Sequence, residues 1–169
     1  IASLSRIVLT VSNLVFEPMI YPLYKKGNQA DLEDLMVVIT RWSLVSSILI
    51  STLLLGLSDY LLGLFGAEFL PAKRAFTILV LANLVDSATG PVDYLLNMTD
   101  YAQVLTRISV RTSAIGICLT PFFIAVLGLE GAAISAGLVL IIRNIWVYQA
   151  AYRHLKINVL PRVFGLRNQ

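Results

Sequence analysis

The sequence predicts an all-α fold: a polytopic bundle of membrane helices. The chain of 169 residues is 57% hydrophobic and only 14% charged, whereas soluble domains carry about 25% charged residues. Its apolar residues gather in five segments, each close to the ~20 residues that a spanning helix needs. These segments cover residues 1 to 24, 42 to 58, 75 to 98, 107 to 127 and 130 to 150. We therefore expect about five transmembrane helices plus one amphipathic helix at the membrane interface.

The connections between these segments differ in character. Residues 27 to 42 place Leu32, Met36 and Ile39 at helical spacing and concentrate acidic residues near the start, as in an amphipathic helix. We expect this helix to lie in the interface and to lead into the second span. Residues 58 to 75 are too apolar for a free loop, which predicts a short interfacial or re-entrant turn. A tight turn is expected between the fourth and fifth segments.

The placement of basic residues predicts the topology. Most of them follow the first, third or fifth segment, whereas the loops on the other side hold only Lys73 and Arg74. By the positive-inside rule, the first group is cytoplasmic. We expect one membrane bundle over residues 1–150 and a basic cytoplasmic tail over residues 151–169.

Polar residues form a stripe in each of two segments. In the third segment they are Asn83, Asp86, Gly90, Asp93 and Asn97, at steps of three or four residues. In the first segment Ser3, Arg6, Thr10, Asn13 and Glu17 have the same spacing. Such spacing puts each set on one helix face. We therefore expect a polar cavity, and its candidate lining residues are Arg6, Thr10, Asn13, Asn83, Asp86, Asp93 and Asn97.

The charged members of these stripes are the strongest candidates. Each of Arg6, Asp86 and Asp93 costs at least ~2.5 kcal/mol at the centre of a membrane helix, so each needs water or a partner. Asp86, Asp93 and Glu17 are candidates for coupling to protons or sodium ions. The alternative is that the stripes only join helices, with Arg6 paired to an aspartate, and that Glu17 is solvated near the cytoplasmic boundary.

Gly90 and Pro91 form a candidate hinge within the third segment. Pro91 removes the backbone hydrogen bond to residue 87, and Gly90 weakens the helix further. Broken helices at mid-depth are typical of transporters. The alternative is a static kink that only shapes the packing.

The sequence offers no support for catalysis, a cofactor or a metal site. The single cysteine, Cys118, lies in an apolar run, and the single histidine, His154, lies in the basic tail. None of the common hydrolase, metalloprotease or nucleotide-binding motifs is present. Asp86 and Asp93 have no neighbouring nucleophile or metal ligand. The basic residues are dispersed, which argues against binding of nucleic acid.

Three stretches carry a resemblance to a known family: "FEPMIYPLYKKGNQADLEDLMVVITRW", "LLGLFGAEFLPAKRAFTILVLANLVDSATGPVDYLLNMTD" and "LGLEGAAIS". In this order they resemble the C-terminal part of bacterial polysaccharide biosynthesis transporters. These are the O-antigen and lipid-linked oligosaccharide flippases of the multidrug/oligosaccharidyl-lipid/polysaccharide exporter superfamily. The chain starts with Ile1 inside an apolar pattern, so we interpret it as part of a longer protein. Asp86 and Asp93 depart from the family, which has mostly apolar or small residues there.

The resemblance implies a transporter of 12 to 14 helices in two lobes, of which this chain would hold most of the second. The expected partners are then a lipid-linked oligosaccharide, membrane lipid, the N-terminal lobe, and polysaccharide polymerase or assembly proteins. The implied function is flipping of the substrate across the bacterial inner membrane by alternating access. The alternatives are a cation-coupled multidrug extruder of the same superfamily, a non-transporting membrane scaffold for envelope assembly, and a membrane-embedded glycosyltransferase that lacks its metal-binding loop.

Overall fold

The computed structural model describes residues 21–25 and 29–155, and all regular structure in this part of the chain is helical. Its elements are α2 (Gln29–Gly56), α3 (Ser58–Gly63), the 3-10 helix η1 (Ala67–Ala72), α4 (Lys73–Thr89), α5 (Val92–Asn97) and α6 (Ala102–Leu155). The expected all-α class is thereby confirmed. Two helices, Ala30–Gly56 and α6, are long and apolar enough to cross a membrane.

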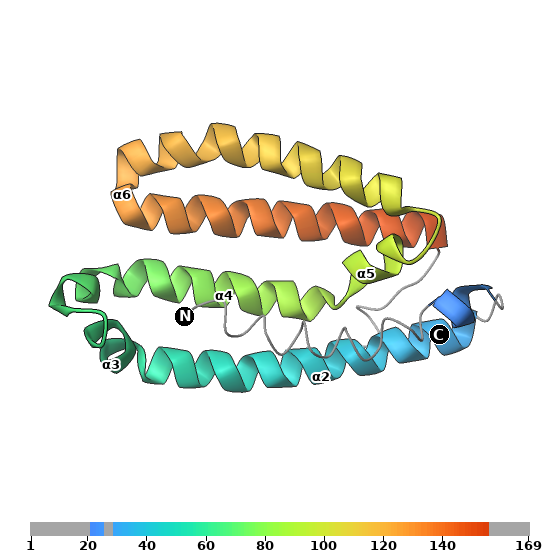
Figure 1. Cartoon of the computed structure of the whole chain (residues 1–169), viewed down its shortest axis with the longest axis horizontal. Coiled ribbons are helices and arrows are strands. Elements are labelled where there is room, and N and C mark those ends of the chain that lie inside the picture. The colour runs from blue at the N-terminus through green and yellow to red at the C-terminus, as the bar shows by residue number, and fades with distance from the viewer. Residues whose placement is uncertain (1–20, 26–28, 156–169) are drawn as a thin grey trace, which may run out of the picture.

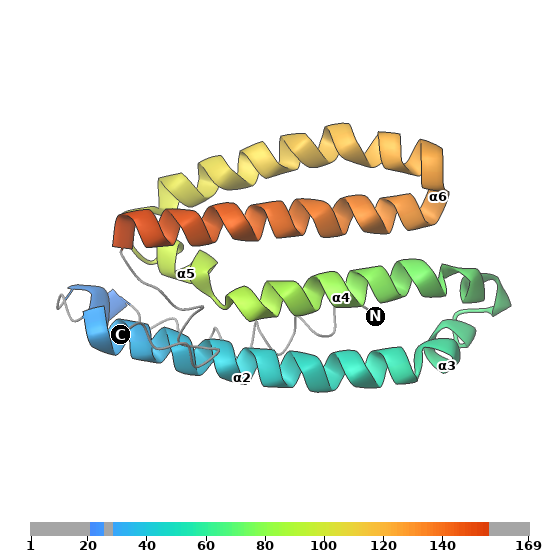
Figure 2. The same cartoon turned by 180° about the vertical axis from the view of Figure 1, so that it is seen from behind.

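The long helices lie side by side in one stack, as Figures 1 and 2 show from opposite sides. α4 packs between α2 and α6, and α5 packs against α6 just beyond the end of α4. α3 and η1 form the connection from α2 to α4 at one end of the stack. This connection occupies residues 58 to 75, where the sequence predicts a short interfacial or re-entrant turn.

α2 is one continuous helix and not an interfacial helix followed by a separate span. Residues 29–55 contain neither glycine nor proline, so nothing interrupts the backbone hydrogen bonds. Its amphipathic first part buries Leu32, Met36 and Ile39 inside the protein. At ~1.5 Å per residue the helix is roughly 42 Å long, more than the ~30 Å hydrocarbon core.

The third apolar segment is broken into two helices. α4 ends at Thr89, Gly90 has φ 73° and ψ −173°, and α5 begins at Val92 after Pro91. The positive φ of Gly90 is one that other residues rarely adopt. A Cβ atom there would also lie 2.0 Å from the Thr40 side-chain oxygen of α2. Glycine is therefore required both by the backbone turn and by the close approach of α2.

α6 consists of two antiparallel halves, residues 102–127 and 129–155, joined at Gly128 with φ 58° and ψ −132° (Figure 1). The halves approach closely, because a Cβ atom on Gly131 would lie 1.9 Å from the Phe123 carbonyl oxygen. The Ser135 hydroxyl lies 3.2 Å from the Thr120 hydroxyl across the same contact. The second half runs without interruption past residue 150, where the sequence predicts the tail to begin.

Two apolar clusters of buried residues lie toward opposite ends of the stack. The larger joins the start of α2, α5 and both halves of α6, with Met36, Leu95 and Val147 among its buried members. The smaller joins the end of α2, α3 and α4 through Leu54, Leu62 and Val80. Between them α2 presents a row of buried hydroxyl residues to its neighbours: Thr40, Ser43, Ser47 and Ser51. The middle of the stack is consequently more polar than either end.

The helix break gives a first testable prediction. Gly90→Ala places a Cβ atom against Thr40 and forces alanine into a positive φ, costing ~1–2 kcal/mol for the backbone and ~1–3 kcal/mol for overpacking. Its melting temperature in detergent micelles should fall, and adding Thr40→Ala should restore part of the loss. Gly56→Ala, where nothing lies within 4 Å, is the control and should have little effect. Equal melting temperatures for the Gly90 and Gly56 variants would contradict this account of the break.

Candidate functional site: a polar junction at the helix break

The break between α4 and α5 places a carboxylate on each side of it. Asp86 lies in the last turn of α4, and Asp93 lies in the first turn of α5. Because the chain changes direction at Gly90, the two residues do not belong to one straight helix face. Each carboxylate instead meets the part of α6 that packs beside it.

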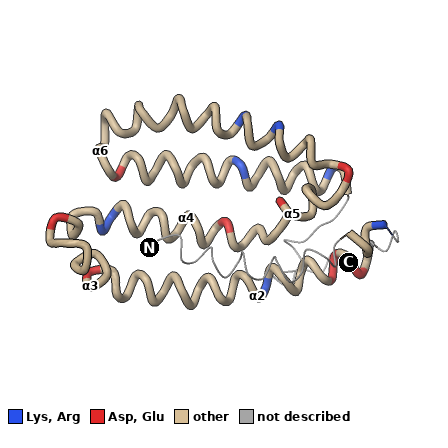
Figure 3. Tube along the Cα trace, in the orientation of Figure 1, with Lys and Arg blue, Asp and Glu red and all other residues tan. Residues whose placement is uncertain are grey.

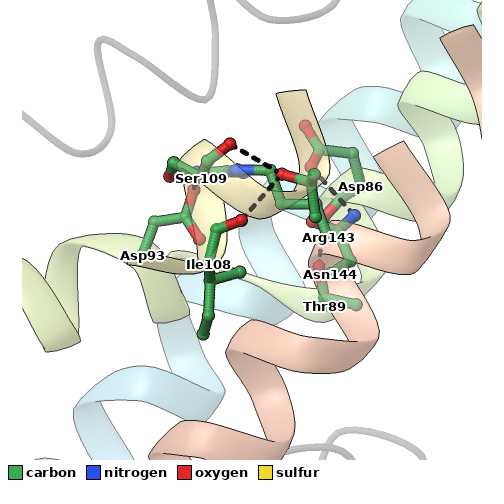
Figure 4. A network of polar contacts seen from close by, with 8 residues as sticks. Asp86, Thr89, Asp93, Ile108, Ser109, Arg143 and Asn144 are labelled. Carbon is green, nitrogen blue, oxygen red and sulfur yellow. Dashed lines mark hydrogen bonds and ion pairs between the residues drawn. The ribbon is translucent and has the colours of Figure 1, made fainter. Parts of the chain in front are cut away.

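The residues that meet them are Arg143 and Asn144, near the middle of the second half of α6. The Arg143 guanidinium forms an ion pair with the Asp93 carboxylate. The Asn144 side-chain amide donates a 3.0 Å hydrogen bond to Oδ1 of Asp86. Two consecutive residues of α6 thus contact the carboxylates on both sides of the break, as Figure 4 shows. We call Asp86, Asp93, Arg143 and Asn144 the polar junction.

Hydroxyl side chains form hydrogen bonds around the polar junction, both to the backbone and to one another. Thr89 donates to the carbonyl oxygen of Asp86 at 2.7 Å. Ser87 donates to Ser47 of α2 at 2.9 Å, which ties α4 to the polar row of α2. On the first half of α6, the Thr112 hydroxyl donates to the carbonyl oxygens of Ile108 and Ser109, which Figure 4 shows beside the polar junction. The site is therefore held from three directions, by α2, by the α4–α5 break and by α6.

The polar junction is partly buried, so its charged and polar groups depend on their contacts with one another to offset the loss of water. The side chains of Arg143 and Asp93 are 27% and 33% exposed, and Asn144 is only 5% exposed. Removing a charge from water is costly, and an opposite charge at contact distance offsets that cost. A hydrogen bond from a buried amide to a carboxylate contributes about 1.5–3 kcal/mol. Chemically, the guanidinium suits phosphate, and the carboxylates and the amide suit hydroxyl groups or cations.

The remaining candidates from the sequence are placed differently. Arg6, Thr10, Asn13 and Glu17 lie outside the described residues. Asn83 donates from its amide to the carbonyl oxygen of Leu79 in its own helix, at 2.8 Å. Asn97 is exposed at the end of α5. Of the third-segment stripe, Asp86 and Asp93 bond α6 through their side chains, while Gly90 shapes the break between them.

Arg143 and Asn144 are absent from the candidates drawn from the sequence. The signal for Arg143 was nevertheless present, since it stands in the apolar run from 130 to 150 just as Asp86 stands in the third segment. A charge within a spanning segment needs a partner of opposite charge. That reasoning links Arg143 with the two aspartates, although it does not decide between them.

Among the described residues, no group of three or more His, Cys, Asp or Glu side chains lies together as a metal site would require. Comparison of the chain with protein-family models, with curated proteins and with solved structures gave no match. The polar junction therefore has to be interpreted from its own chemistry.

A double-mutant cycle tests the ion pair. Asp93→Asn and Arg143→Gln each remove one charge of the ion pair, so each should destabilise the protein, and the double variant should lose less than their sum. We expect a coupling energy of about 1–3 kcal/mol from unfolding in detergent. The control is the pair of Lys73 and Asp59, 2.7 Å apart with side chains 49% and 68% exposed, whose coupling should be below ~1 kcal/mol. A junction coupling no larger than this surface value would mean that the pair does not hold α5 to α6.

Proposed function

We propose that this chain forms part of a membrane transporter that moves lipid-linked oligosaccharide or polysaccharide precursors across the bacterial cytoplasmic membrane by alternating access. The observation that carries the proposal is the polar junction, in which a broken helix with a carboxylate on each side faces an arginine and an asparagine at the middle of a long apolar helix. Discontinuous helices at mid-depth are where secondary transporters bind substrates and coupling ions.

The distribution of side chains supports a membrane location. On α2, large apolar residues such as Leu49 and Leu53 are 67% and 60% exposed, while Ser43, Ser47 and Ser51 of the same helix are buried. On α6, Ile117 and Phe122 are 74% and 65% exposed. This arrangement, with apolar side chains outside and hydroxyl groups inside, suits lipid as the surrounding solvent. We assign the chain to a multi-pass membrane protein with its basic tail on the cytoplasmic side.

Arg143 is the residue that favours an anionic substrate. A guanidinium binds phosphate with paired hydrogen bonds, in the same way as it binds a carboxylate. In the proposed mechanism, the diphosphate of the lipid-linked substrate displaces the Asp93 carboxylate from Arg143. Because Asp93 belongs to α5 and Arg143 to α6, this exchange loosens the contact between the two helices and couples binding to their relative movement. Asp86 and Asn144 then hydrogen-bond sugar hydroxyls, and Asp86 is the candidate site for coupling to a cation gradient.

A multidrug extruder of the same superfamily is the second candidate. A cationic drug suits Asp86 and Asp93 but is repelled by Arg143, so the two candidates differ in the charge of the substrate that the polar junction accepts. A non-transporting scaffold needs neither exchange nor movement at this site. Transport measured with an anionic and with a cationic substrate separates all three.

The proposed topology has a direct test. On a Cys118→Ala background, cysteines replacing the exposed residues Lys25 or Gln103 should react with a membrane-impermeant thiol reagent only from the cytoplasmic side. A cysteine replacing the exposed Glu68 of η1 should react only from outside, because the positive-inside rule places that connection there. Labelling in intact cells and in inverted vesicles measures both. Reaction of positions 25 and 68 from the same side would overturn the arrangement.

The proposed activity is tested in vesicles that contain the protein and a fluorescent isoprenoid-diphosphate oligosaccharide, with chemical quenching of the dye in the outer leaflet as the measurement. Relative to an equal amount of folded protein, Arg143→Gln should slow flipping at least about tenfold, because each ~1.4 kcal/mol of lost interaction is tenfold in rate. Arg143→Lys should recover part, since it keeps the charge but loses the paired hydrogen bonds.

The control for this assay is Asp59→Asn, an exposed residue at the α3 end of the stack that should retain normal flipping. Asp86→Asn should change how the rate depends on an imposed proton or sodium gradient. Movement of a cationic dye without movement of the lipid would favour the multidrug extruder. If the protein moves neither, the scaffold becomes the better account.

A further inference from the structure

Two arginines on the outer side of α6 have no role in the polar junction. Arg107 and Arg111 lie one turn apart on the first half of α6, and both are exposed. Figure 3 shows in blue where the basic residues lie along the described chain. In the part of the chain that the structure describes, neither guanidinium takes part in an ion pair. Beyond Arg111, no charged residue occurs before Glu130. The pair thus stands at the edge of the apolar run, where a spanning helix meets the phosphate groups of the membrane.

An apolar groove of about 790 Å³ begins directly beyond these arginines. Its lining includes Ser113, Gly116, Ile117, Thr120 and Ile124 of the same helix. Gly116 lets the two halves of α6 approach closely behind the groove, because a Cβ atom there would already lie 3.4 Å from the Val139 side chain. The lining from 113 to 125 extends for roughly 18 Å at ~1.5 Å per residue, slightly more than half of the ~30 Å hydrocarbon core.

The arginines and the groove share one helix face. Arg107, Arg111, Ser113 and Ile117 are all exposed, so the arginines and the groove lie on the same exposed side of the helix. Val110 is 64% exposed, so the path between the charges and the groove is open and apolar. This face therefore presents a site for anions at one end and a channel for a hydrocarbon chain along its length.

We propose that this face of α6 binds an anionic phospholipid of the surrounding bilayer, with its phosphate on Arg107 and Arg111 and one acyl chain in the groove. Charge complementarity selects this occupant. A zwitterionic lipid carries a cationic group that the two arginines repel, and a free phosphate ion makes no use of the groove. The site rests on the membrane location of α6 but not on transport, and it is measured without transport substrate.

Cys118 provides the probe, because it is the only cysteine of the chain, is exposed and follows the groove residue Ile117. The protein is labelled there with an environment-sensitive fluorophore and placed in phosphatidylcholine vesicles. Equal fractions of brominated phosphatidylglycerol or brominated phosphatidylcholine are then added as quenchers. We expect the anionic lipid to quench more strongly. The ratio of the two apparent affinities should fall at least about fivefold in Arg107→Gln/Arg111→Gln, since each basic residue near the surface contributes about that factor.

The matched control is Lys25→Gln/Arg153→Gln, which removes the same charge at the same end of the molecule. Tyr24 donates a hydrogen bond to Asp100, and His154 stacks on Tyr101, so both control residues are near the start of α6 but outside its groove face. This variant should keep the preference for the anionic lipid, as should Arg107→Lys/Arg111→Lys, which preserves the charge. Equal quenching by both lipids in the unchanged protein would overturn the proposal, and so would a preference that survives Arg107→Gln/Arg111→Gln.

Discussion

The ion pair between Arg143 and Asp93 is the interaction on which the middle of the fold depends. α5 has only six residues, too few to be stable as a helix on its own. It is held by Leu95 and Leu96, which are fully buried in the larger apolar cluster, and by its own Asp93, whose carboxylate pairs with Arg143 of the facing helix α6. The same pair makes an arginine tolerable halfway along an apolar helix. The same ion pair therefore both stabilises α5 and compensates the charge of Arg143.

The packing around this pair uses small and hydroxyl-bearing residues. α2 approaches the break through Thr40 and Ser47, and Gly90 admits that approach. The Ser43 and Ser51 hydroxyls are buried without a hydrogen-bond partner among the described residues. Close contact between backbones is the main source of helix association when lipid competes for the apolar side chains. The small side chains in the polar row of α2 thus serve the close approach of neighbouring helix backbones as much as hydrogen bonding.

The sequence was sufficient for the helical class and for recognising Gly90 and Pro91 as a weak point, because composition, period and proline chemistry act locally. It could not show that α2 is continuous. Leu32, Met36 and Ile39 form an apolar helix face, and such a face has the same pattern whether it rests on lipid or on a protein core. Asp93 pairs with Arg143, and Asp86 bonds Asn144, because of how α4 and α5 dock on α6. The paired residues are 50 or more positions apart in the chain. Local sequence patterns do not show which residues so far apart in the chain will be in contact.

The separation of Asp93 from Arg143 along the chain also sets the order in which the protein is made. Synthesis proceeds from the N-terminus, so both carboxylates leave the ribosome well before the guanidinium exists. The α4–α5 region cannot reach its final arrangement until the second half of α6 follows. That half arrives as the return arm of a tight hairpin, since Gly128 and Gly131 let it pack directly on residues 102–127. The second half of α6 therefore completes the arrangement of the described segments that are made before it.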